Sequence, residues 1–154
     1  MAEDMTREER VQKLAVRNAR AREEFRANGG VTERYGKSLI IMHTLGAKTG
    51  LEREIPVVAR PEDGGWVVLA AVQGAPNNPD WYYNLVANPE ILVEHPGASG
   101  VETSHVRVDV VPPEKWEAEF EAVCAVSPAF REMQARTTRR IPILHLRRLG
   151  PGTA

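Results

Sequence analysis

The chain has little of what marks several large protein classes. Its 154 residues contain one cysteine, Cys124, so an internal disulfide is excluded. No apolar run is long enough to span a membrane, and the N-terminus lacks an apolar signal core. Lys and Arg (20) nearly balance Asp and Glu (21), which argues against a nucleic-acid partner. These absences predict a cytoplasmic protein and leave peripheral membrane contact open.

Motifs for metal-dependent or nucleophilic catalysis are also missing. The four histidines (His43, His95, His105 and His145) have no metal-ligand spacing, so no metal site is expected. No serine lies in a nucleophile elbow, and Cys124 has no evident catalytic partner. An enzyme with so few catalytic groups of its own is best explained by a cofactor that carries the reaction.

Residues 1–30 predict a helical extension. Thr6 and Glu9 have the spacing of a capping box, and Gly29-Gly30 is a stop signal. The apolar stripe between them is thin. The helix therefore either packs loosely on the domain or serves as a lid or a surface anchor.

Residues 31–150 predict one domain, and 151–154 a C-terminal tail. Short apolar strands alternate with short helices, and Asn78 is expected to cap the first of these helices. About six strands with interspersed helices predict a mainly β fold, a small barrel. The expected strands are 38–44, 53–60, 66–71, 91–95, 101–110 and 141–149.

Two segments suit the parts of a redox cofactor. Residues 47–50 form a turn with backbone N–H groups, a Lys and a Thr, and Arg53 follows, so this turn suits a phosphate or a carboxylate tail. Residues 78–84 place aromatic side chains at the start of a helix, which suits a flat ring. The alternative is structural, because exposed turns often contain Lys, Thr and Gly, and Trp81 can simply pack on the barrel.

Ordered landmarks along the chain strengthen this interpretation. They are Thr44 to Gly50, Arg53 with Pro56, Gly74-Ala75, Asn78-Pro79, Trp81-Tyr82, Asn84-Leu85, Ala87 to Pro89, and Arg140 to Pro142. With them the chain resembles the deazaflavin-dependent nitroreductase family of actinobacteria, over roughly residues 38–146. The resemblance implies an FMN-binding-like split β-barrel.

The resemblance also implies coenzyme F420, an 8-hydroxy-5-deazaflavin with a polyanionic phospholactyl-oligoglutamate tail. Its reduced form gives a hydride to an acceptor stacked on the ring. Lys48, Thr49 and Arg53 match the positions that hold the tail. The implied cofactor-binding residues are Ala47, Lys48, Thr49, Arg53, Ile55, Pro56, Val57, Val58, Ala70, Ala71, Val72, Gln73, Gly74, Asp80, Trp81, Tyr82, Tyr83 and Asn84.

Departures from the family pattern bear on the acceptor. Ala47 stands where a cation is usual, which removes one charge from the tail site. The late helix that carries substrate-facing tyrosines in the nitroreductase has Ser127, Phe130 and Met133 here. Val72, Phe130 and Met133 would shape the acceptor pocket, with Ser127 the one candidate proton donor.

Three functions follow from these patterns. The first is an F420-dependent reductase acting on an apolar quinone, enone or nitro compound, as a monomer or a homodimer. The second is a binding protein for F420 or an apolar ligand that catalyses no reaction. The third is an FMN-binding reductase, since FMN shares the phosphate requirement.

Overall fold

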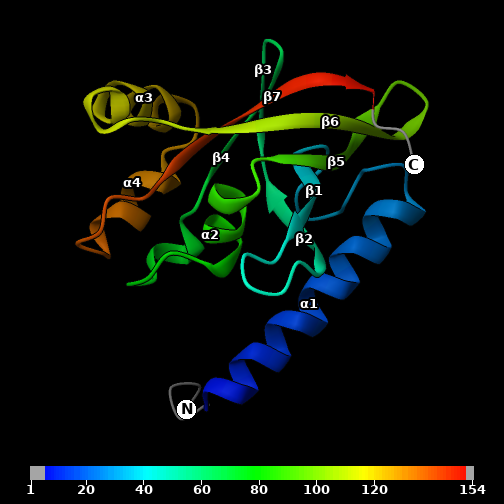
Figure 1. Cartoon of the computed structure of the whole chain (residues 1–154), viewed down its shortest axis with the longest axis horizontal. Helices are drawn as coiled ribbons and strands as arrows, with labels where there is room; N and C mark the ends of the chain where they lie inside the picture. The colour runs from blue at the N-terminus through cyan, green and yellow to red at the C-terminus, as the bar shows by residue number, and fades with distance from the viewer. Residues whose placement is uncertain (1–5, 152–154) are drawn as a thin grey trace.

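The structure, a computed structural model of the chain, describes residues 6–151 and contains one curled sheet with helices around it (Figure 1). The strands are antiparallel, in the order β2-β1-β5-β6-β7-β4-β3. They are β1 (Leu39–Leu45), β2 (Glu52–Val58), β3 (Arg60–Glu62), β4 (Gly65–Leu69), β5 (Glu90–Gly97), β6 (Gly100–Val110) and β7 (Ile143–Pro151). The helices are α1 (Arg7–Ala27), α2 (Asp80–Ala87), α3 (Pro113–Val126) and α4 (Ala129–Ala135), with a 3-10 turn η2 (Val72–Gly74).

One residue, Ala59, joins the two edge strands of this sheet. A flat sheet of seven strands would hold its edges about 29 Å apart, because neighbouring strands lie about 4.8 Å apart. Ala59 separates β2 from β3 by a single position and is 2% exposed. Its N–H donates a hydrogen bond to the Ser38 carbonyl at 2.8 Å. The sheet must therefore curl until its edges meet, which confirms the predicted split barrel.

The curled sheet has an inner core and two smaller clusters on its outer face. Met42 and Leu144 are fully buried inside the barrel. Phe25 of α1 packs on Ile41 outside it, and α3 and α4 cover a second outer cluster that includes Ile143. Strands β1 and β4 are buried on both faces, which explains their continuous apolar sequences.

Besides shifts of one or two residues at the ends of the other strands, the strands differ from the prediction in two places. The expected strand 53–60 divides at Ala59 into β2 and β3, so the sheet has seven strands rather than about six. The expected strand 66–71 ends at Leu69, because the next residues bend into η2. Both differences arise at corners where the chain leaves one sheet direction for another.

The start of α2 also differs from the prediction. The helix begins at Asp80 with Pro79 as its N-cap, and no side chain caps it. Asn78 was expected there, but its Oδ1 instead accepts a hydrogen bond from Arg139 at 2.7 Å. The predicted cap is therefore wrong, since a distant residue engages the side chain.

Helix α1 begins with the predicted capping box, in which Thr6 and Glu9 exchange hydrogen bonds of 3.1 Å. Its N-terminal part projects beyond the barrel (Figure 1). No helix in the described part of the chain is long and apolar enough to cross a membrane. The division into 1–30, 31–150 and 151–154 stays a prediction, and residues 1–5 and 152–154 lie outside the described residues.

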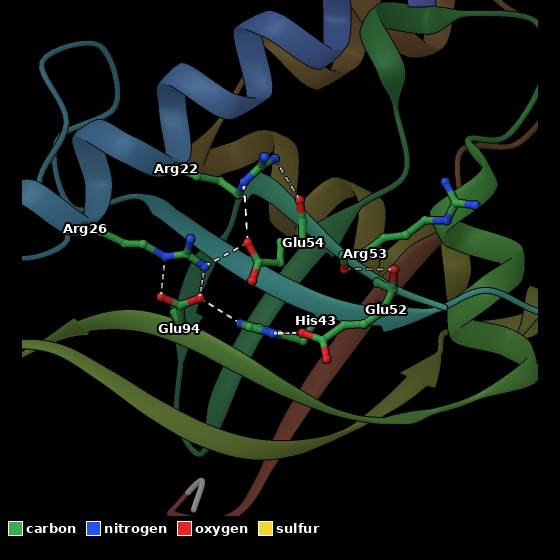
Figure 2. A network of polar contacts seen from close by, with 8 residues as sticks. Arg22, Arg26, His43, Glu52, Arg53, Glu54 and Glu94 are labelled. Atoms are coloured by element: carbon green, nitrogen blue, oxygen red, sulfur yellow. Dashed lines mark hydrogen bonds and ion pairs between the residues drawn. The ribbon is translucent and has the colours of Figure 1, made fainter. Parts of the chain in front are cut away.

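A chain of charged contacts fastens α1 to the outer face of β1, β2 and β5 (Figure 2). The Arg26 guanidinium donates to Glu94 through both Nε and an Nη, and that Nη lies 3.0 Å from Glu54 Oε1. His43 lies between two carboxylates, with Nδ1 2.6 Å from Glu52 Oε1 and Nε2 2.7 Å from Glu94 Oε2. The network holds α1 in place where its apolar contact is small.

The network favours a protonated His43. Burial lowers the pKa of His43, but hydrogen bonds with Glu52 and Glu94 outweigh burial and raise the pKa above 6.5. The Arg26 guanidinium holds the pKa of Glu94 below its ordinary value, against the effect of burial. Because the folded-state pKa of His43 is raised, its stabilising contribution is complete below the unfolded pKa. That contribution is lost as pH rises through the folded pKa.

We expect His43→Gln to lower the free energy of unfolding most at pH 6 and below. The difference from the unsubstituted chain should shrink as pH rises through the raised pKa, because the imidazole is then neutral in both states. Urea denaturation at a series of pH values measures this. His105→Gln, which removes a more exposed imidazole from the same sheet face, is the control. If His43→Gln lowered the free energy of unfolding by the same amount at every pH, the assignment of a protonated His43 would be contradicted.

Candidate functional site

The turn between β1 and β2 is built around two glycines. Gly50 has a φ of 71°, and its N–H donates to the Gly46 carbonyl at 2.8 Å. The Leu51 N–H donates to Thr49 Oγ1 at 3.2 Å, and a Cβ on Gly46 would lie 2.5 Å from that oxygen. Glycine is therefore needed at position 50 for its backbone angle and at position 46 for space. The predicted tail residues 47–49 are exposed at this turn.

Two asparagines of α2 and its C-cap hold the turn. The Ala47 N–H donates to Asn84 Oδ1 at 2.9 Å, and Asn88 Nδ2 donates to the Leu45 carbonyl at 3.3 Å. Asn84 is 9% exposed. The Asn84 side chain thus holds the predicted tail-binding turn in place. Its position in the sequence, next to Trp81, Tyr82 and Tyr83, does not reveal this role.

Two cations at this turn have no internal counterion. Lys48 and Arg53 are both exposed, and neither forms an ion pair with another described residue. The neighbouring carboxylates, Glu52 and Glu54, lie on the other face of β2 in contact with His43 and the α1 arginines. Figure 2 shows the Arg53 guanidinium pointing away from that network. The turn therefore carries an uncompensated positive charge.

An apolar rim lies on the inner side of the same strand. We use the term for Ile55 and Val57 of β2, Trp81 and Tyr82 of α2, and Ala70 after β4. The first four are partly buried against the inner core, and Ala70 is fully buried within it. Residues from three separate segments are thus brought together, and the partly exposed surface of the β2 and α2 residues suits a flat apolar ring.

The predicted acceptor residues form a neighbouring group. Phe130 and Met133 of α4 pack with Ala71 in the outer cluster under α3, not in the inner core. A Cβ on Gly74 would lie 2.6 Å from the Met133 carbonyl oxygen, so α4 packs directly on η2. Ser127 is the C-cap of α3, and its carbonyl accepts the Phe130 N–H at 3.2 Å.

Val72 is the link between the rim and this group, and it is strained. Its φ is 46°, a left-handed value that β-branched residues rarely adopt, and it is 43% exposed. Gln73 and Gly74, with φ 81° at Gly74, complete the turn η2. Such strain persists where surrounding contacts impose it, and it is common at binding sites.

Four predicted cofactor residues lie away from the rim. Pro56 and Val58 line a cleft between α1 and β2 on the outside of the sheet. Asp80 is exposed at the start of α2, and Tyr83 is 53% exposed, with its phenol oxygen 3.5 Å from Asn78 Nδ2. The structure does not group these four with Ile55 and Val57.

Comparison with known proteins assigns the chain to a family. The family model described as F420H(2)-dependent quinone reductase matches residues 15–147. The chain belongs to this family. It is an F420H(2)-dependent reductase, and its cofactor is coenzyme F420.

Similar proteins agree with the assignment. An F420H(2)-dependent quinone reductase of Mycobacterium tuberculosis is 30% identical over 114 residues, which cover 71% of this chain and 72% of that protein. A solved F420-H2 dependent reductase, FDR-A, has a TM-score of 0.59 at 28% identity and covers 71% of this chain and 94% of its own. A second solved chain, described as a domain-swapped dimer, has a TM-score of 0.62 at 25% identity. The match covers 88% of this chain and 98% of the solved chain.

The residues of this F420H(2)-dependent reductase fit the chemistry of its cofactor. A tail of phosphate and glutamate carboxylates needs cations that are not already paired, and Lys48 and Arg53 meet that condition. A deazaflavin ring needs apolar walls, which the rim offers. A metal is not needed for this fit. The one group of described residues close enough to ligate an ion (His43, Glu54 and Glu94) is engaged by Arg26.

Arg139 organises the site, and the sequence analysis missed it. Its guanidinium donates to the carbonyls of Ala70 (3.0 Å), Ala71 (2.7 Å) and Ala75 (2.8 Å), and to Asn78 Oδ1 (2.7 Å). No carboxylate takes part, and burial lowers the pKa of Arg139. The contacts enclose η2 from both sides and so impose the strained turn. The only signal in the sequence was its position beside the landmark that begins at Arg140.

We expect Arg139→Gln to lower the free energy of unfolding by roughly 1.5–3 kcal/mol, the range for hydrogen bonds to a charged group. Amide hydrogen exchange at Gly74, whose N–H donates to Ala71, should accelerate as well. Urea denaturation and exchange mass spectrometry measure the two effects. Arg147→Gln removes an exposed arginine that pairs with Asp109 and should change the free energy by less than about 1 kcal/mol. Equal effects in both variants would show that Arg139 has no special role.

Proposed function

We propose that the chain transfers a hydride from reduced F420 to an apolar conjugated acceptor such as a quinone, an enone or a nitro compound. The observation that carries the proposal is the position of two uncompensated cations, Lys48 and Arg53, directly before the apolar rim. When bound, the reduced cofactor supplies the hydride from C5 of its ring.

The protein's own contribution is placement. Lys48, Thr49 and Arg53 would hold the phosphate and the glutamates of the tail, with Arg53 matching oxygen pairs through its planar fork. The rim residues Ile55, Val57, Trp81 and Tyr82 would hold the ring and keep water from it.

The acceptor would lie beside η2 and α4, at the exposed side chain of Val72. Phe130 and Met133 offer apolar area beside Ala71, and Val72 exposes its side chain next to them. Phe130 has no hydroxyl to donate, so the Ser127 side chain is our candidate proton donor. This composition favours a planar apolar acceptor, of which a quinone is the main example.

The assembly and the location of the protein stay predictions. The similar structure described as a domain-swapped dimer supports a homodimer over a monomer. Exposed Val11 and Leu14 in the first half of α1 support peripheral membrane contact of a cytoplasmic protein.

We expect Lys48→Ala combined with Arg53→Ala to weaken F420 binding at least tenfold. Each charge-assisted contact to the tail contributes roughly 1.5–3 kcal/mol, part of which solvent screening removes. Fluorescence titration of F420 measures the dissociation constant. Arg107→Ala combined with Arg147→Ala removes two exposed cations that already have carboxylate partners and should leave it unchanged. Equal affinity in both double variants would refute the tail assignment.

We expect reduced F420 to be oxidised by quinones in the presence of the protein, with enones and nitroarenes as further acceptors to be ranked. Loss of F420H2 absorbance over the uncatalysed background measures turnover. No rate above background with any acceptor would contradict the proposed acceptor class. A larger rise of melting temperature with FMN than with F420 would contradict the proposed fit of the site to the F420 tail.

A further inference from the structure

A cleft of about 250 Å³ lies between α1 and β2, and it shares one lining residue, Val57, with the rim. One wall is the middle of α1, with Arg17, Arg20 and Ala21. The other wall includes Pro56 and Val58, which point to the opposite side of β2 from Ile55 and Val57 because side chains alternate along a strand. The implied cofactor residues Pro56, Val57 and Val58 line one side of the cleft, but neither the cofactor assignment nor the acceptor assignment accounts for its arginine wall.

Three arginines line the cleft without a counterion. Arg17, Arg20 and Arg34 form no ion pair with any residue in the described part of the chain, 6–151. Further along the same helix, by contrast, Arg22 and Arg26 are paired with Glu54 and Glu94. On α1, Arg22 and Arg26 thus fasten the helix to the sheet, whereas Arg17 and Arg20 line the cleft without an ion pair to a described residue.

One carboxylate, that of Glu24, lines the cleft. Its Oε2 accepts the backbone N–H of Glu33 at 2.7 Å, so it already has a role in the turn that follows α1. With three guanidinium groups against one carboxylate, the cleft has a net charge of about +2, which attracts an anion. Guanidinium groups bind carboxylate and phosphate oxygens in pairs, which makes these two groups the best match.

The rest of the lining is apolar. Tyr35, Leu39, Pro56 and Val58 contribute ring and aliphatic surface, and Val58 is 42% exposed. The Arg34 guanidinium lies 5.3 Å from the centre of the Tyr35 ring, at the border between the charged and the apolar part. A simple inorganic anion would leave this apolar surface in water, whereas an amphiphile would cover it.

We propose that the cleft binds a small anionic amphiphile: a carboxylate or phosphate head at the three arginines and a short hydrocarbon portion along Pro56 and Val58. The arginine wall of the cleft belongs to α1 and the turn after it, whereas the rim residues Ile55, Trp81 and Tyr82 do not line the cleft. This proposal goes beyond the reductase function and does not depend on it.

The test is a titration of the isotopically labelled full chain, followed by amide chemical shifts. The probes are decanoate and decyl phosphate, with decanol as the neutral control and inorganic phosphate as the control without a chain. We expect both anionic amphiphiles to shift amides of Tyr35, Leu39 and Val58. Decanol and inorganic phosphate should bind at least tenfold more weakly, because decanol lacks the anionic head and inorganic phosphate lacks the hydrocarbon chain.

Matched variants locate the site. Arg20→Gln combined with Arg34→Gln should weaken decanoate binding at least tenfold. Arg7→Gln combined with Lys13→Gln removes two exposed cations of α1 outside the cleft and should leave binding unchanged. Equal weakening in both variants, or none in either, would overturn the assignment, and F420 titration of each variant shows whether the fold is intact.

Two further binding experiments distinguish a free anionic amphiphile from a membrane surface and from the cofactor. If phosphatidylglycerol vesicles bind the chain but monomeric decanoate does not, α1 recognises a membrane surface and the cleft proposal is wrong. If saturating F420 abolishes decanoate binding, the two ligands share one site and the separate cleft is refuted. Simultaneous binding of decanoate and F420, each with its own shifted amides, supports the proposal.

Discussion

The closure of the sheet at Ala59 is the constraint on which the rest of this structure depends. Two edge strands joined by one buried residue cannot lie at opposite ends of a flat sheet. The resulting curl gives the sheet an inside, filled by residues such as Met42 and Leu144. It also places β2 at an edge, where its inner residues remain partly exposed and available to a ligand.

Strand β2 shows how a strand separates two kinds of charge. Glu52 and Glu54 lie on its outer face and are engaged by His43, Arg22 and Arg26. Arg53, between them in the sequence, points to the other face (Figure 2). The alternation of side chains along a strand thus keeps a cation free for an external anion next to carboxylates that would otherwise neutralise it.

The segment after β4 depends on a residue that is far from it in the sequence. Arg139 binds three carbonyls there, and Gly74 leaves just enough room for α4 to pack on η2. The strained Val72 persists because these contacts hold its neighbours on both sides. An otherwise unfavourable turn is thereby placed between the apolar rim and the α4 side chains of this F420H(2)-dependent reductase.

The local patterns of the sequence determined much of the protein. Short apolar runs, with alternation in the last two strands, indicated most strands. The Thr6 capping box indicated the start of α1, and ordered landmarks indicated the family, because each depends on neighbours in the chain. Tertiary structure alone decided the division of a strand at Ala59, the engagement of Asn78 by Arg139, and that Lys48 and Arg53 stay without a counterion. These depend on contacts between residues distant in sequence, such as Arg26 with Glu94 and Arg139 with Ala70, and local spacing does not encode such contacts.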